Sequence, residues 1–161
     1  MAEETAVPDS KQPKEPDGMF PAKVDDKGRL KLPGIFQEYF AKFPERTLWV
    51  TSIDGLTAQL YNQVVWRERV KKELAARGQA GKDMLWLAND FGETQEVDGQ
   101  GRVQLPTNLR RELGLENQQV RLVVEGLRVE ILSDQQYRER KRSSLQSARQ
   151  NKAAFDEAGI I

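Results

Sequence analysis

The first part of the chain alternates between apolar and polar residues with the two-residue period of a β-strand. Residues 19–24 (MFPAKV) and 29–33 (RLKLP) lie on either side of the polar turn DDKG. Alternation around a glycine-containing turn predicts a β-hairpin, in which Gly28 adopts a backbone conformation that most residues avoid. Pro33 then ends the second strand and suits the first turn of a helix, because it has no N–H group to lose there.

A helix and a second hairpin follow. In residues 34–43 (GIFQEYFAKF) the apolar side chains recur every three to four positions, which predicts an amphipathic helix. Residues 47–52 (TLWVTS) and 56–61 (LTAQLY) alternate again and are joined by the turn IDG. This pattern predicts a second hairpin, so the order of elements is hairpin, helix, hairpin.

The same order of elements returns in the second part of the chain. Here the short helix is expected to turn Leu109 and Leu113 inward and to stop at Gly114, a residue typical of helix C-termini. The second set of expected elements is a hairpin over 93–106 about the turn DGQG, a helix over 107–115, and a hairpin over 120–132 about Glu125-Gly126.

One ten-residue phrase occurs twice. VDDKGRLKLP at 24–33 and VDGQGRVQLP at 97–106 lie 73 residues apart and are identical at six of ten positions. Since the flanking elements repeat as well, we interpret the chain as an internal repeat. One copy is too small to bury a comfortable core, whereas two copies can close on each other and cover their sheet edges. We therefore expect an α+β fold, mainly β, in which two halves form one pseudo-symmetric β-barrel with helices after each half.

Composition divides the chain further. The start of the chain is rich in Pro, Glu, Asp and Lys and has little to bury, which is typical of disorder. Each half is followed by a basic, helix-prone stretch. The expected divisions are a disordered leader (1–17), a first half (18–65), a basic linker helix region (66–90), a second half (91–138) and a C-terminal helix and tail (139–161).

The overall composition excludes several function classes. The chain has 161 residues, a formal net charge of zero and a mean hydropathy of −0.70. It contains no Cys and no His, which removes disulfides, thiolate or imidazole metal ligands, and Ser-His or Cys-His catalysis. No apolar run approaches the length of a membrane span, and the acidic start does not resemble a signal peptide. We expect a cytoplasmic protein that is not an enzyme, has no catalytic residues and uses no cofactor or metal.

The repeated phrase has two compatible interpretations. In the structural one, Asp25 accepts N–H groups of the turn, Gly28 makes the bend and Arg29 pairs with the aspartate. In the functional one, the hairpin tip presents Lys27 and Arg29, and Arg102 in the second copy, to a polyanion. A two-stranded ribbon can enter the major groove of DNA, and arginine suits both phosphates and guanine edges.

The two phrases resemble the paired D-x-x-x-R motifs of the MraZ family of bacterial regulators. Asp25 to Arg29 and Asp98 to Arg102 match the motif, and the resemblance runs from about Gly18 to Arg142. The stretch GRVQLPTNLRRELGL also resembles the swapped-hairpin DNA-binding domain of AbrB-type regulators. This resemblance implies tandem AbrB-like halves and a ring-like homo-oligomer associated with the nucleoid. It also implies repression of the division and cell wall gene cluster through short repeated boxes in double-stranded promoter DNA.

The resemblance also assigns roles to individual residues. The first half has Gln37 at the position of Arg110, and the second has Gln100 at the position of Lys27. Each half therefore keeps a different subset of cations. The expected DNA contacts are Lys27, Arg29, Arg102, Arg110 and Arg111, and the residues that shape the turns and orient the arginines are Asp25, Gly28, Asp98 and Gly101.

Other interpretations remain open. An AbrB-type barrel can also act as an antitoxin-like module that holds a protein partner through a disordered tail. The basic stretches 66–82 and 134–152 are more typical of solvated helix faces than of a second DNA contact. Trp66 and Tyr137 lack a basic aromatic array around them, so we expect them to pack in the core or at a subunit interface. A metal site at Asp25 and its neighbour is disfavoured, because Lys27 and Arg29 lie beside them.

Overall fold

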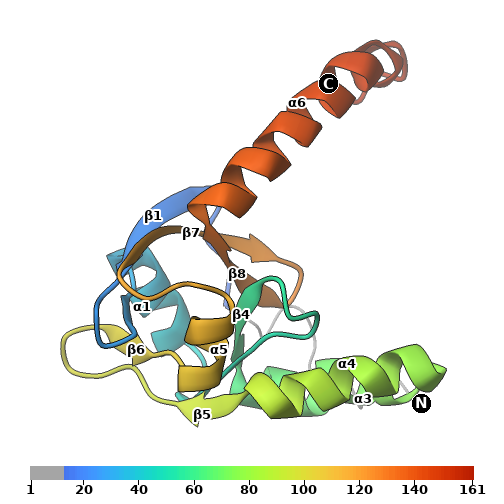
Figure 1. Ribbon diagram of the computed structural model, residues 1–161. Helices are drawn as coiled ribbons and strands as arrows, with labels where there is room; N and C mark the ends of the chain where they lie inside the picture. Colours follow the sequence, from blue (N-terminus) through green and yellow to red (C-terminus); the bar gives the residue numbers. More distant parts are fainter. Residues whose placement is uncertain (1–12) are drawn as a thin grey trace.

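The computed structural model describes residues 13–161, so most of the leader expected over 1–17 lies outside the described residues. Two similar halves follow each other along the chain, and each continues into a helical segment (Figure 1). The first half and its helices are β1 Met19–Val24, β2 Arg29–Lys31, α1 Gly34–Ala41, β3 Leu48–Thr51, β4 Ala58–Asn62, α2 Gln63–Val65, the π-helical η3 Trp66–Val70, α3 Lys71–Ala75 and α4 Gly78–Phe91. The second half is β5 Glu93–Gln95, β6 Arg102–Gln104, α5 Thr107–Glu112, β7 Gln118–Glu125, β8 Arg128–Ser133 and α6 Asp134–Glu157.

The strands form one sheet of eight in the order β5-β3-β4-β8-β7-β1-β2-β6, and all of its pairings are antiparallel. Exchanging the halves (β1 for β5, β2 for β6, β3 for β7 and β4 for β8) preserves every reported pairing except that of β1 with β2. The expected mainly β, pseudo-symmetric barrel is therefore confirmed. It closes almost completely, because its two end strands β5 and β6 are joined by a turn.

The halves are interleaved rather than placed side by side. β1 pairs along its whole length with β7 of the other half, and β5 pairs with β3. The local hairpin predicted over 93–106 is therefore wrong in its strand pairing, because β5 has its ladder with β3 while β6 pairs with β2. Only the turn of that hairpin forms, with the Asp98 N–H donating to the Arg102 carbonyl at 2.9 Å. The first hairpin is equally short, since its strand register consists of the single pair Val24 and Leu30.

The core lies inside this barrel and is built from the apolar positions that the alternation marked. Phe36 and Phe40 of α1 and Leu109 of α5 are buried in this core, as predicted, and the half-buried Leu113 packs against it. Gly114 ends α5 with a φ of +65°, and the N–H of the next residue returns to the Arg110 carbonyl at 2.9 Å. The fully buried aliphatic residues of the barrel include Val24, Leu30, Leu32, Leu48, Val50, Leu60, Val103, Leu105, Leu122 and Ile131.

The two helical segments differ in how they contact the barrel. Trp66 is buried, with its ring 4.9 Å from Tyr61 and 6.0 Å from Trp49 between ring centres, which confirms its packing role. α6 instead starts at the barrel and projects away from it (Figure 1). Its first turn is fixed by a capping box between Ser133 and Gln136. Across residues 13–161, no helix is both long and apolar enough to cross a membrane.

Candidate nucleic-acid interface

The two copies of the repeated phrase lie next to each other in the barrel. β2 pairs with β6 so that Arg29 is opposite Gln104, Leu30 opposite Val103, and Lys31 opposite Arg102. Leu30 and Val103 are fully buried. Because side chains alternate along a strand, the residues on either side of them face outward. The β2–β6 ribbon therefore presents one outer face with the side chains of Arg29, Lys31, Arg102 and Gln104.

The first hairpin tip is organised by the carboxylate of Asp25. Its Oδ1 accepts the N–H groups of Lys27 and Arg29, both at 2.9 Å, while Oδ2 accepts Arg29 Nε at 2.8 Å. Gly28 permits the bend with a φ of +80°. The ion pair occupies the Nε edge of Arg29, whose side chain stays 30% exposed. The Nη atoms are consequently the groups that Arg29 can offer to a ligand.

The second tip repeats this arrangement. Asp98 Oδ1 accepts the N–H groups of Gln100 and Arg102 at 2.8 and 2.9 Å, and Oδ2 accepts Arg102 Nε at 2.9 Å. Gly101 has a φ of +77°. In both tips the pKa of the aspartate is lowered, chiefly because its carboxylate accepts the backbone N–H of the motif arginine. The predicted turn chemistry is therefore present in both halves.

Each tip is also held by the other half. Gln104 Nε2 donates to the Lys27 carbonyl at 2.9 Å, and Lys31 Nζ donates to the Gln100 carbonyl. Lys31 and Gln104 occupy equivalent positions, 73 residues apart. The N–H groups of the residues that follow them, Leu32 and Leu105, donate to the carbonyls of the opposite tip glycines at 2.9 Å. The alternation in RLKLP and RVQLP placed Lys31 and Gln104 on the outer face, but their contacts across the two halves carry no local sequence signal.

Arg110 lies beneath the first tip and not on the outer face. Its side chain is only 14% exposed, Nε pairs with Glu116 at 3.0 Å and Nη1 donates to the Leu105 carbonyl at 2.9 Å. A Cβ added to Gly28 would lie 2.3 Å from Arg110 Cδ, so the arginine fills the space left by that glycine. Arg110 therefore has the contacts of a residue that supports the tip.

Gln37 makes the equivalent contacts under the second tip. Its Nε2 donates to the Leu32 carbonyl at 2.7 Å, and a Cβ on Gly101 would lie 2.2 Å from that nitrogen. The two residues share a supporting position even though one is charged and one is neutral. Of the other predicted contacts, Lys27 is exposed at the first tip, while Arg111 is exposed on α5. Within residues 13–161, no group of three or more His, Cys, Asp or Glu side chains is arranged to hold a metal ion.

Comparison with known proteins places this arrangement in a family. A family model described as "MraZ protein, putative antitoxin-like" matches residues 91–157. Proteins named transcriptional regulator MraZ from Koribacter versatilis and Acidobacterium capsulatum are 42% and 40% identical over 97 and 96 residues. In both cases the match covers 58% of this chain and 65% of the relative, so the chain spans about two thirds of their length. A relative of the same name from Desulforamulus reducens is 33% identical over 123 residues, which cover 74% of this chain and 82% of that protein. The chain thus belongs to the MraZ family.

Proposed function

We propose that this protein is a non-enzymatic transcriptional repressor that binds promoter DNA of the bacterial division and cell wall gene cluster. The observation that carries the proposal is the β2–β6 ribbon, which presents Arg29, Lys31 and Arg102 on one outer face. The name of the relatives, transcriptional regulator MraZ, agrees with this role. The protein would act at the nucleoid in the cytoplasm.

The geometry of the tips suits direct reading of bases. A two-stranded ribbon fits the major groove, where the Nη atoms of an arginine can donate to both acceptors of a guanine. The ion pairs with Asp25 and Asp98 hold Arg29 and Arg102 in one orientation before DNA arrives. Because the side chains are already ordered, less conformational entropy is lost on binding.

The two halves would contribute unequally to this contact. Lys27 and Lys31 of the first half correspond to Gln100 and Gln104 of the second, so most of the additional positive charge lies with the first tip. We assign Lys27 and Lys31 to phosphates and Arg111, which is exposed on α5, to the flanking backbone. Arg110 contributes by supporting the first tip, since its guanidinium is occupied by Glu116 and Leu105.

A single chain has few tip cations, so high affinity requires several copies acting together. Copies arranged side by side in a ring present their tips in the same sense. We therefore propose that the homo-oligomer recognises direct repeats of a short box, spaced so that each box faces the same side of the duplex.

The proposal is tested with Arg29→Ala and a duplex from the region upstream of the protein's own gene. A bidentate guanine contact is worth about 1–3 kcal/mol, so fluorescence anisotropy should show affinity falling roughly 5- to 150-fold. Arg138→Ala is the matched control, because Arg138 also pairs with an aspartate at 2.8 Å but lies on α6. If Arg29→Ala lowered the melting temperature and kept full affinity, Arg29 would serve only the turn and the proposal would fail.

An antitoxin-like function is the second candidate, favoured by the description of the matching family model. Salt dependence separates the two. Each phosphate neutralised by the ribbon contributes about 0.9 to the slope of log affinity against log salt concentration. A steep negative slope with the upstream duplex supports the repressor, whereas the absence of DNA binding at low salt would leave the protein-binding function as the better account.

A further inference from the structure

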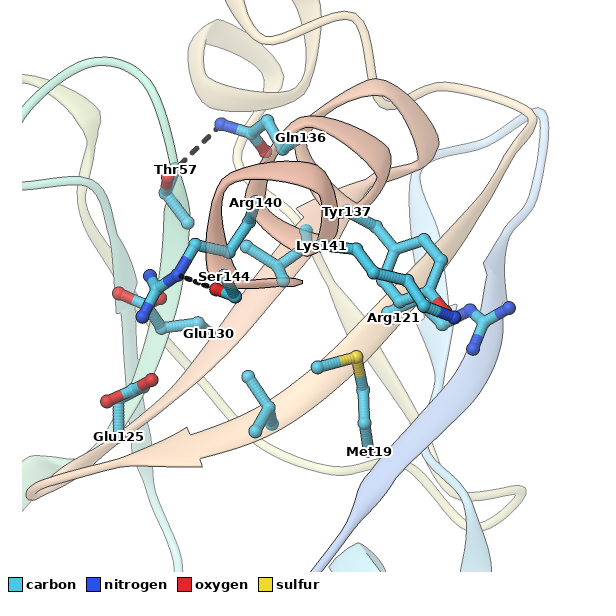
Figure 2. A pocket seen from close by; sticks show the side chains of 12 residues that line it. Met19, Thr57, Arg121, Glu125, Glu130, Gln136, Tyr137, Arg140, Lys141 and Ser144 are labelled. Atoms are coloured by element: carbon cyan, nitrogen blue, oxygen red, sulfur yellow. Dashed lines mark hydrogen bonds between the residues drawn. The ribbon is translucent and has the colours of Figure 1, made fainter. Parts of the chain in front are cut away.

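A groove of about 560 Å³ lies where α6 leaves the barrel, away from the β2–β6 ribbon. Met19 of β1, Val123 of β7 and Leu132 of β8 give it an apolar surface. Figure 2 shows Arg121, Lys141 and Tyr137 gathered on one side of Met19, and Arg140, Glu130 and Glu125 on the other. The volume is within the roughly 300–1,000 Å³ typical of ligand pockets, so it is large enough to hold a few side chains.

The charged groups of the groove have an excess of positive charge. Its lining contains three basic side chains, Arg121, Arg140 and Lys141, and two acidic ones, Glu125 and Glu130. Arg128, a fourth cation, lies next to the groove and pairs with Glu130 at 3.0 Å, so the charge of this carboxylate is already balanced. Arg121 and Lys141 lie 4.2 and 5.6 Å from the centre of the Tyr137 ring. An occupant with apolar side chains and adjacent carboxylates would complement this lining.

The far end of α6 has that composition. Phe155, Ile160 and Ile161 are 50%, 66% and 67% exposed, and we call them the apolar knob. Asp156 and Glu157 directly follow Phe155 in the sequence and are exposed, and Asp156 lies 3.6 Å from Lys152 Nζ on the same helix, a long surface pair that a partner's cations would have to replace.

The backbone of the knob is held by a helix cap. Gly159, with a φ of +73°, turns the chain back, so that its N–H donates to the Asp156 carbonyl at 3.0 Å. The Ile160 N–H donates to the Phe155 carbonyl at 3.1 Å. These two bonds are those of a Schellman cap, in which the residue after the glycine packs near the last helical turn. The cap thus fixes the backbone next to Phe155 before a partner binds.

The knob of a chain cannot occupy the groove of the same chain. α6 is one continuous helix from Asp134 to Glu157, and it projects from the barrel in Figure 1. Lys141 in the groove and Phe155 in the knob are separated by about 21 Å of helix axis at 1.5 Å per residue. No residue of α6 is buried within the part of the chain that the structure describes. A second copy is the partner that can bring a knob to each groove.

We propose that the apolar knob of one copy docks into the groove of the next copy, with Asp156 and Glu157 against Arg140 and Lys141. The contact joins different surfaces of the two copies, so it leaves a free knob and a free groove, and it builds a ring when the rotation between successive copies closes. This proposal rests on the homo-oligomer of the proposed function and names the surfaces that build it.

The first test uses the absence of cysteine from the chain. Ser144→Cys places a thiol in the groove, and Ala158→Cys places one beside the knob. When the two single-cysteine proteins are mixed and oxidised, disulfides between the different variants should exceed those within each variant. Asn89→Cys, exposed on α4, is the control and should not link to Ala158→Cys. Preferential linking of Ala158→Cys to itself would indicate pairing of α6 helices and would overturn the proposal.

The second test measures molar mass against concentration by light scattering. Phe155→Ser and the double variant Asp156→Lys/Glu157→Lys should each weaken self-association about tenfold or more, the effect expected for an interface anchor. Trp86→Ser removes a side chain that is 68% exposed on α4 and should have no such effect. If Trp86→Ser dissociated the oligomer and Phe155→Ser did not, the proposed contact between knob and groove would be wrong, but the homo-oligomer itself would still be supported. A wild-type protein that stayed monomeric would overturn both, and DNA binding through Arg29 would still be decided by its own variant.

Discussion

Replacing one glycine of the second tip should destabilise the protein, while replacing its neighbour should not. Gly101 has a φ of +77°, and an added Cβ would lie 2.2 Å from Gln37 Nε2. An alanine in the left-handed region costs about 1–2 kcal/mol. Moving Gln37 away from the Leu32 carbonyl, which it reaches at 2.7 Å, costs about 0.5–1.5 kcal/mol more. Gly101→Ala is therefore expected to lower the free energy of unfolding by about 1.5–3.5 kcal/mol.

The matched control lies two residues earlier in the same turn. Gly99 has no positive φ, and a Cβ built there meets no atom within 4 Å. Gly99→Ala should be neutral or stabilise by about 0.4–1 kcal/mol, because it restricts the unfolded chain. For a chain of this size 1 kcal/mol shifts the melting temperature by about 2–4 °C, so thermal denaturation should show Gly101→Ala melting roughly 3–14 °C lower.

A double-mutant cycle separates the two contributions. In a Gln37→Ala background the space beside Gly101 is open, so Gly101→Ala should cost about 0.5–1.5 kcal/mol less there than in the wild type. Chemical denaturation of the four proteins gives this coupling energy. An equal cost in both backgrounds would show that Gln37 does not support the tip. Equal melting temperatures for the Gly99→Ala and Gly101→Ala variants would refute the conformation of the turn itself.

Three further outcomes are expected. Folding lowers the pKa of Asp25 and Asp98, so their contribution to stability is complete above the unfolded value of 3.8 and is lost as the pH falls through the lower folded values. Denaturant midpoints should thus drop in acid, and less so in the double Asp→Asn variant; an unchanged drop would argue against these carboxyls. Burial raises the pKa of Tyr39 and Tyr61 to about 12, whereas the hydrogen bond from Lys141 lowers the pKa of Tyr137, so ultraviolet titration should show Tyr137 ionising first. Tyr137→Phe should remove this first step, and a first step that persisted in the variant would contradict the assignment. Inserting about half a helical turn of DNA, roughly 5 bp, between two promoter boxes should cost most of the avidity, while a full turn of about 10 bp should cost less; affinity that ignored helical phase would exclude the multi-copy model.

The order of elements and most of the core could be predicted from the sequence, because each follows from local periodicity. Leu30, Leu32 and Phe36 were marked by the two- and 3.6-residue periods, and all three are fully buried. Strand pairing could not be predicted in this way. The residues of β5, Glu-Thr-Gln, carry no apolar pattern that distinguishes β3 from β6 as a partner. The resemblance to swapped-hairpin domains indicated the exchange that the local pattern missed.

The candidate site shows the same division. Asp25 and Arg29 are four residues apart, and their ion pair follows from the chemistry of the turn between them. The position of Arg110 depends on a glycine 82 residues earlier and on Glu116, whose proximity only the folded chain reveals. The repeat pattern therefore predicted that Arg110 lies near the tip. It did not predict whether the side chain faces solvent or supports the backbone of the tip.

The interleaved sheet has a consequence for biosynthesis. Met19 pairs with Val123, so β1 cannot form its ladder until a strand 104 residues further along the chain has been synthesised. A nascent chain that has left the ribosome only as far as β4 lacks β7 and β8 and exposes the inner faces of its own strands. Such long-range pairing is slow and exposes unpaired edges during synthesis. We therefore expect the fold to form late, when β7 and β8 have left the ribosome, and a polypeptide interrupted before them to be prone to aggregation.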